Sequence, residues 1–199
     1  MMFIFLLVML FCSIPKVSFA QDSGGEFVEI KDAGAVLEQI ATGINEKGGL
    51  AAVGEGISKR SDLAKDKARN DGLGKMVETL NQKISRLTKH FVEEVGGGQE
   101  TEINETFSRV QKNIAINELK GAIAKESKLS KNNKTGQYMA AVLVTITPKV
   151  INQSIADEVK NSSPKLWERF RSSRAFDELQ NETEKFEQSE QAKEIIQGQ

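Results

Sequence analysis

The sequence contains few of the side chains that most often carry out chemistry. Its 199 residues include one cysteine, Cys12, and one histidine, His90. Cys12 lies in an amino-terminal segment that we expect to be removed, and its loss would exclude disulfides and thiol chemistry. A single histidine near the carboxyl end of a helix is more typical of a contact with the helix dipole or solvent than of catalysis. We therefore expect no catalytic residue, no metal site and no bound cofactor.

An excess of positive charge is also missing. The chain has 27 basic and 28 acidic residues, and the two kinds are interleaved. Nucleic acids bind where basic residues are in excess on one face, so a nucleic-acid partner is not expected. Two glycine-containing fragments fail as phosphate-binding motifs: Lys59 stands where a dinucleotide fingerprint beginning at Gly54 needs glycine, and Arg69 where a P-loop ending at Gly74-Lys75 needs one.

The first twenty residues have the pattern of a cleavable export signal. An apolar run from Phe3 to Cys12 is followed by Pro15 and by the small-x-small triplet Ser18-Phe19-Ala20. We expect residues 1–20 to be a signal peptide and the mature chain to begin near Gln21, outside the cytoplasm.

Two alternatives to cleavage exist for this segment. A retained membrane anchor is disfavoured because the run from Phe3 to Phe11 is far shorter than the roughly 18 apolar residues that span a bilayer. Lipid attachment to Cys12 is disfavoured because Phe11 stands where a small residue is needed.

Residues 21–47 read as a tether followed by a short helix over 33–44, with Gly48-Gly49 after it. Residues 50–57 then form a predicted strand rich in alanine and glycine, and small strand residues favour close approach by another element.

A long amphipathic helix of about 34 residues is predicted from Ser61 to Val95. Ser61 and Asp62 are favourable amino-terminal caps, and three glycines follow Val95. Gly72 and Gly74 each weaken a helix by about 1 kcal/mol relative to alanine. We expect either close packing against the small-residue strand at these glycines or a kink.

The remainder is predicted to be a second helix from about 102, a hairpin and two further helices. The hairpin has arms over 118–128 and 137–147, and its second arm is apolar on both faces, which indicates a central strand. Helices follow over 150–159 and from Ser163-Pro164 through Phe186. The fold class expected for residues 48–187 is α+β, with a small antiparallel sheet of about three strands packed by the long helix and a C-terminal helix. Residues 188–199 form a polar tail.

One short stretch of the last predicted helix combines basic and aromatic side chains. It could contact anionic headgroups or an acidic partner, although acidic neighbours make a solvated helix face the competing interpretation. The candidate interaction surface consists of Lys165, Trp167, Arg169, Phe170, Arg171 and Arg174.

Three stretches together resemble the LPP20 family of bacterial envelope proteins. They are Ala52–Gly56 with Leu63–Asp71, Tyr138–Val144, and Leu166–Leu179. The family is similar in fold to the amino-terminal domain of a flagellar H-ring assembly protein, and many of its members are lipoproteins. The resemblance implies a small α+β domain without a known catalytic site.

Together these features predict a non-enzymatic exported protein, in the periplasm or associated with the outer membrane, that acts as a protein-interaction or structural module. Its expected partners are envelope proteins, and peripheral contact with a membrane remains open. The alternatives are a membrane-surface protein, and a hydrolase or carbohydrate-binding protein with an unrecognised site.

Overall fold

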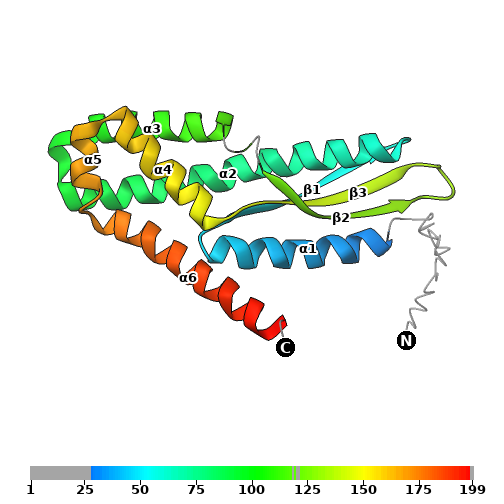
Figure 1. Cartoon of the computed structure of the whole chain (residues 1–199). Coiled ribbons are helices and arrows are strands. Elements are labelled where there is room, and N and C mark those ends of the chain that lie inside the picture. Colours follow the sequence, from blue (N-terminus) through cyan, green and yellow to red (C-terminus); the bar gives the residue numbers. More distant parts are fainter. Residues whose placement is uncertain (1–27, 118, 120–121, 198–199) are drawn as a thin grey trace, which may run out of the picture.

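The computed structural model describes residues 28–117, 119 and 122–197 (Figure 1). The predicted signal peptide and the first part of the tether lie outside the described residues. The described elements are α1 (Val28–Glu46), β1 (Leu50–Ser58), α2 (Ser61–Val95), a 3-10 turn (Gly97–Gln99), α3 (Glu100–Asn117), β2 (Ile123–Lys131), β3 (Tyr138–Ile146), α4 (Pro148–Ser162), α5 (Pro164–Phe170) and α6 (Arg174–Gln197). The predicted α+β class with a three-stranded antiparallel sheet is confirmed.

The sheet has the order β1-β3-β2 and lies between two helices. Alternate residues of β3 point to opposite faces. Ala140, Val142 and Val144 belong to the core that contains α2, whereas Ala141 and Leu143 pack with α1. Figure 1 shows α2 on one side of the strands and α1 on the other. The second hairpin arm is therefore the central strand, as predicted, and α1 is longer than the helix predicted over 33–44.

Helix α2 lies unusually close to β1. A Cβ atom added to Gly54 would be 1.9 Å from the carbonyl oxygen of Ala68, and one added to Gly72 would be 2.8 Å from a methyl carbon of Val144. The expected close approach is confirmed at Gly72. Gly74 has open space around it, so it plays no part in this contact.

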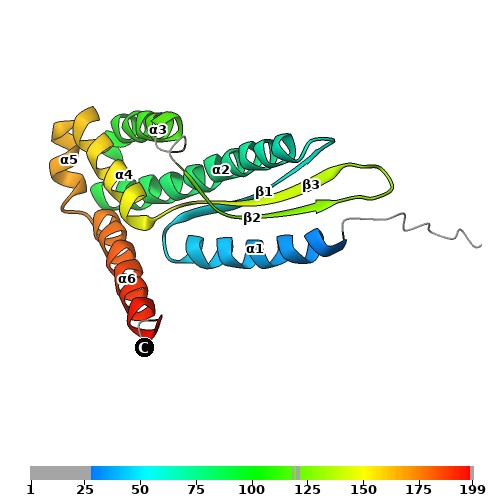
Figure 2. The ribbon, with the colours of Figure 1, turned by 45° about the vertical axis from the view of Figure 1, so that its right-hand side comes forward.

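The other half of α2 packs on α3 and α6, which together with α4 and α5 form the helical end of the molecule (Figures 1 and 2). Its core is a cluster of aromatic rings joined mainly by edge-to-face contacts. The cluster contains Phe91, Phe107, Trp167, Phe170 and Phe176.

Three details of the sequence interpretation are wrong. The single helix predicted from Ser163-Pro164 through Phe186 is two helices, because the chain turns between Phe170 and Arg174 and points aromatic rings from both into one cluster. The residue at the N-cap position of α2 is Arg60, and its side chain makes no capping hydrogen bond. Ser61 is the first residue of the helix and not its cap. The first hairpin arm, predicted over 118–128, is β2 at Ile123–Lys131. Residues 188–197, within the predicted polar tail, continue α6.

Candidate functional site

The predicted basic and aromatic surface is only partly a surface. Phe170 is 0% exposed and belongs to the core, so its inclusion is wrong. Trp167 is half-buried, with its ring centroid 5.4 Å from that of Phe176. The short helix α5 buries Leu166 and Phe170 on the face that packs on the helical end. Lys165, Arg169, Arg171 and Arg174 are exposed.

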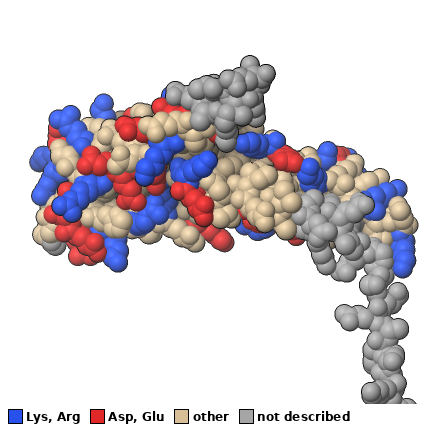
Figure 3. Space-filling model, turned by 90° about the horizontal axis from the view of Figure 1, so that it is seen from below, with Lys and Arg blue, Asp and Glu red and all other residues tan. Residues whose placement is uncertain are grey.

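These cations do not form one positive patch. Arg171 pairs with Glu168 at 2.7 Å, and Arg169 contacts the side-chain oxygen of Gln99. Glu94 accepts a hydrogen bond from the backbone amide of Arg174 at 2.9 Å. Figure 3 shows basic and acidic side chains intermixed over this end of the molecule. The structure therefore offers little to attract an anionic surface here.

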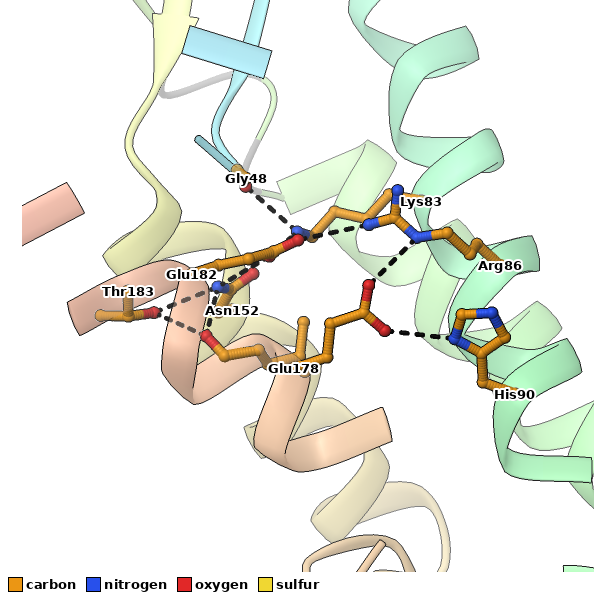
Figure 4. Close-up of polar contacts among 9 residues, drawn as sticks. Gly48, Lys83, Arg86, His90, Asn152, Glu178, Glu182 and Thr183 are labelled. Atoms are coloured by element: carbon orange, nitrogen blue, oxygen red, sulfur yellow. Dashed lines mark hydrogen bonds and ion pairs between the residues drawn. The ribbon is translucent and has the colours of Figure 1, made fainter. Parts of the chain in front are cut away.

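A cluster of polar side chains that the sequence did not reveal joins α2, α4 and α6 (Figure 4). We call it the α6 junction. Its side chains are those of Lys83, Arg86, His90, Asn152, Glu178, Glu182 and Thr183, and the backbone carbonyl of Gly48 joins them.

Lys83 occupies the centre of the α6 junction. Its ammonium group donates to the carbonyl oxygen of Gly48 at 3.1 Å and contacts the carboxylate of Glu182. The Lys83 side chain is 6% exposed. Burial lowers the pKa of Lys83 below its ordinary value, and the neighbouring carboxylate of Glu182 opposes this shift without cancelling it.

Charged groups extend from Lys83 toward the solvent. Arg86 bonds to Glu182 at 3.2 Å and to Glu178 at 3.4 Å, and Nδ1 of His90 lies 3.2 Å from Glu178. His90 therefore contacts α6, in addition to lying near the carboxyl end of its own helix. Because these pairs connect α2 to α6, they fasten the last helix to the molecule.

Asn152 completes the α6 junction from α4. Its amide nitrogen donates to the carbonyl oxygen of Leu179 at 2.9 Å and to Thr183 at 3.1 Å. A shallow cavity of about 320 Å³ adjoins Lys83 and Arg86. Both side chains already bond to protein groups, so the arrangement is best suited to holding helices together.

One flank of α1, next to the face that packs on the sheet, presents a second candidate site. Leu37 and Ala41 face the sheet, while Val36 and Ile40 are 53% and 36% exposed. A groove of about 220 Å³ adjoins Ile40 and separates α1 from α6, and it is also lined by Gly43, Ile44, Lys47, Lys125, Ile146 and Phe186. Figure 3, which views this side, shows an uncharged area beside the densely charged helical end.

The sequence carries a signal for this surface in the apolar positions of α1. Val36, Ile40 and Ile44 lie at helical spacing, and α1 also has apolar residues at 37 and 41. These five positions form one stripe about 140° wide around the helix, and the sheet covers only the part that contains Leu37, Ala41 and Ile44.

Two further observations concern metal binding and membrane spanning by the described residues. No group of three or more histidine, cysteine or acidic side chains among them is placed to hold a metal ion. Within the same part of the chain, no helix is sufficiently long and apolar to span a bilayer.

Comparison with known proteins identifies no relative. No protein-family model matches the chain, and neither the curated proteins nor the solved structures contain a match.

Proposed function

We propose that this protein is an exported envelope protein of the LPP20 type that works as a non-enzymatic module for binding other proteins. The export pattern and the three motifs of the sequence support its place in the envelope. The observation that carries the binding function is the exposed apolar side of α1, with Val36 and Ile40 at its centre.

The physical reason is the free-energy cost of leaving this helix face in water. Burial of apolar surface contributes about 25 cal/mol per Å². Contiguous exposed apolar patches commonly mark protein interaction sites. A complementary protein surface would cover Val36 and Ile40 and exclude water from the groove beside them.

Site-specific photo-crosslinking in living cells tests the binding function. A photoreactive side chain at position 36 is expected to give a discrete protein adduct. Position 150 is the matched control, because Val150 is also a valine exposed on a helix, at 46%, and lies on α4. Equal labelling from both positions, or only lipid adducts from position 36, would contradict the proposal.

The proposed location is tested separately by fractionation of the native cell. We expect the protein in the envelope or periplasmic fraction, with a measured mass that places its first residue near Gln21. Recovery of the uncleaved chain from the cytoplasm would refute export and leave the binding experiment unaffected.

A further inference from the structure

The end of the sheet that points away from the helical end carries a local excess of positive charge (Figures 1 and 2). Two segments meet there: residues 57–63, which lead from β1 into α2, and residues 128–138, which contain the turn between β2 and β3. The strand register aligns them, because Ser58 and Lys131 both pair with Tyr138. We call these two segments the sheet tip. They are far apart in the sequence, so their charges add up only in the folded chain.

The sheet tip contains five basic residues and one acidic residue, and three of the cations have no carboxylate beside them. Arg60 pairs with Asp62, and Lys128 pairs with Glu126 at 2.6 Å. Figure 3 shows basic side chains at this extreme end of the molecule. The exposed lysines that pair with no carboxylate among the described residues are Lys59, Lys131 and Lys134.

The turn between β2 and β3 holds its lysines in a defined position. The side-chain oxygen of Asn132 accepts hydrogen bonds from the amides of Lys134 at 2.9 Å and Thr135 at 3.1 Å. The ammonium group of Lys131 lies 5.4 Å from the centroid of the Tyr138 ring. Because the turn is already ordered, a partner that binds these charges has little backbone entropy to overcome.

Exposed apolar side chains accompany the lysines. Ile57, Leu63 and Leu129 belong to the sheet tip and are 46%, 43% and 41% exposed. At a membrane surface, apolar side chains enter the boundary between headgroups and acyl chains, while lysine ammonium groups stay beside the phosphates. A nucleic-acid duplex presents phosphates on its outside and would leave these apolar side chains in water. The combination therefore favours a lipid surface.

We propose that the sheet tip binds the anionic surface of a phospholipid membrane. The strands point toward the bilayer, and the helical end points away from it. Each lysine near such a surface strengthens binding by about fivefold. Three unpaired lysines thus give weak, reversible binding that salt screens. This contact is separate from the proposed protein-binding flank of α1, which lies along the side of the sheet.

Vesicle flotation at low salt tests the contact. The full chain is expected to float with vesicles that contain phosphatidylglycerol, and to lose this binding at high salt. Vesicles of phosphatidylcholine alone measure any binding through the apolar amino-terminal run. Absence of binding to the anionic vesicles, or equal binding to both kinds, would overturn the proposal.

Paired charge reversals locate the contact on the molecule. Lys131→Glu/Lys134→Glu should lower the partition coefficient more than about tenfold. The control Lys165→Glu/Arg174→Glu makes the same change of net charge at the helical end and should change binding less than about twofold. All four positions are exposed, so the fold should persist in both variants. Equal losses, or a tip variant that binds as the wild type, would overturn the proposal.

An environment-sensitive dye tests the orientation. It is attached to Asn133→Cys in the turn or to Asn161→Cys at the helical end, each combined with Cys12→Ser. Both asparagines are exposed. On anionic vesicles the emission should move to shorter wavelength from position 133 only. A shift of equal size at both positions, or at position 161 alone, would refute the orientation.

A short DNA duplex tests the competing partner. Binding of the wild type to the duplex at a salt concentration where it leaves anionic vesicles would overturn the proposal in favour of nucleic acid. The crosslinking from position 36 reports on a protein partner at another surface, so its failure would leave the vesicle result standing. Failure of the vesicle binding would likewise leave the proposed protein binding intact.

Discussion

At the scale of single residues, one missing methyl group decides how closely α2 can lie on the sheet. Gly54 faces the backbone of α2, and a Cβ atom there would come within 2.1 Å of the amide nitrogen of Gly72. Backbone atoms cannot move aside as a flexible side chain can. Close packing therefore depends on glycine at this position.

Gly54→Ala is predicted to destabilise the fold by about 3 kcal/mol or more, because overpacking forces the helix away from the strand. Gly74→Ala is the control, since it has open space and removes a glycine from the same helix. It should stabilise the protein by about 1 kcal/mol. Urea unfolding of both variants checks this. Equal effects would show that the contact is loose.

The buried pair of Lys83 and Glu182 gives a second prediction. Removing one partner leaves the other charge poorly compensated, so Lys83→Met should lower the free energy of unfolding by about 3 kcal/mol. The double variant Lys83→Met/Glu182→Leu should recover most of that loss, because no buried charge remains. Urea unfolding measures each variant. A double variant as unstable as the single one would contradict this account.

The same lysine makes stability depend on pH in the alkaline range. The pKa of folded Lys83 is lowered by burial from its ordinary value of 10.5. At pH values between the lowered pKa of folded Lys83 and 10.5, the unfolded chain binds more protons than the folded chain. The contribution of Lys83 to the free energy of unfolding therefore rises with pH in that range. Urea unfolding at several pH values should show this rise in the wild type and a smaller one in Lys83→Met. Identical slopes would contradict it.

The α6 junction could not be predicted from the sequence. Lys83 and Glu182 are separated by 99 residues, and each is an ordinary charged residue on an amphipathic helix. Only the crossing of α2 and α6 brings them together and removes them from water. The close contact at Gly72 was predictable, because a glycine inside a helix beside a small-residue strand has a local cost that packing must offset.

At the scale of elements, the outer edge of β1 is closed by side chains. Exposed strand edges are templates for unwanted pairing, and here alternate backbone groups of β1 already have partners. The bonds are Asn45 to both backbone groups of Ala51, Lys75 to Val53, Glu55 to Asp71, and Lys67 to Ile57. Helix α2 therefore covers this edge as well as one face.

The opposite edge, β2, is protected by different means. Most of its side chains are exposed, and it carries Lys125, Lys128 and Lys131 with a bulge between Ala124 and Glu126. Lysines and bulges on an edge strand discourage pairing with another sheet.

Asp71→Ala tests the closed edge of β1. Burial raises the pKa of Asp71, but the hydrogen bond from the Glu55 amide and the contact with Lys75 outweigh it, so the net pKa lies below 3.8. We expect Asp71→Ala to cost about 1 kcal/mol near neutral pH. Because this depressed pKa stabilises the fold above 3.8, the difference from the wild type should vanish as the pH falls through the folded-state pKa.

Urea unfolding from neutral to acidic pH measures this difference. Asp66→Ala, on an exposed position of the same helix, is the control and should change stability little. A loss of equal size for the two variants, or one independent of pH, would show that the bond to the strand edge contributes nothing.

Elements defined by local pattern were predicted well, and those defined by packing were not. The bounds of β1 and α2 follow from the change of apolar period between them. The turn between α5 and α6 has no such marker, because neither glycine nor proline occurs between Phe170 and Arg174. Ser173 stabilises the turn by donating to the carbonyl of Phe170 at 2.6 Å and accepting from the amide of Phe176 at 3.3 Å.

At the scale of the whole molecule, α2 connects two regions that differ in composition. Its first half packs on the sheet through Ala64 and Ala68, and its second half packs on the helical end through Leu87 and Phe91. These residues belong to one continuous core. Neither end can lose its packing without exposing part of the same helix.

This arrangement predicts a single cooperative unfolding transition. Trp167 is the only tryptophan and lies at the helical end, so its fluorescence reports on that end. Far-ultraviolet circular dichroism reports on all elements together. The two denaturation curves should coincide. A tryptophan transition at lower urea concentration would show that the helical end unfolds separately from the sheet.

The sequence by itself determined the class of the fold, the long helix and the central strand. These depend on local periodicity, and apolar residues repeating every two or every three to four positions specify a strand or a helix with a buried side. Only the tertiary structure decided which side of α1 is buried, that Phe170 is core, and that Lys83 meets Glu182. These facts depend on contacts between distant segments, and no local pattern records which face of an element its neighbours will cover.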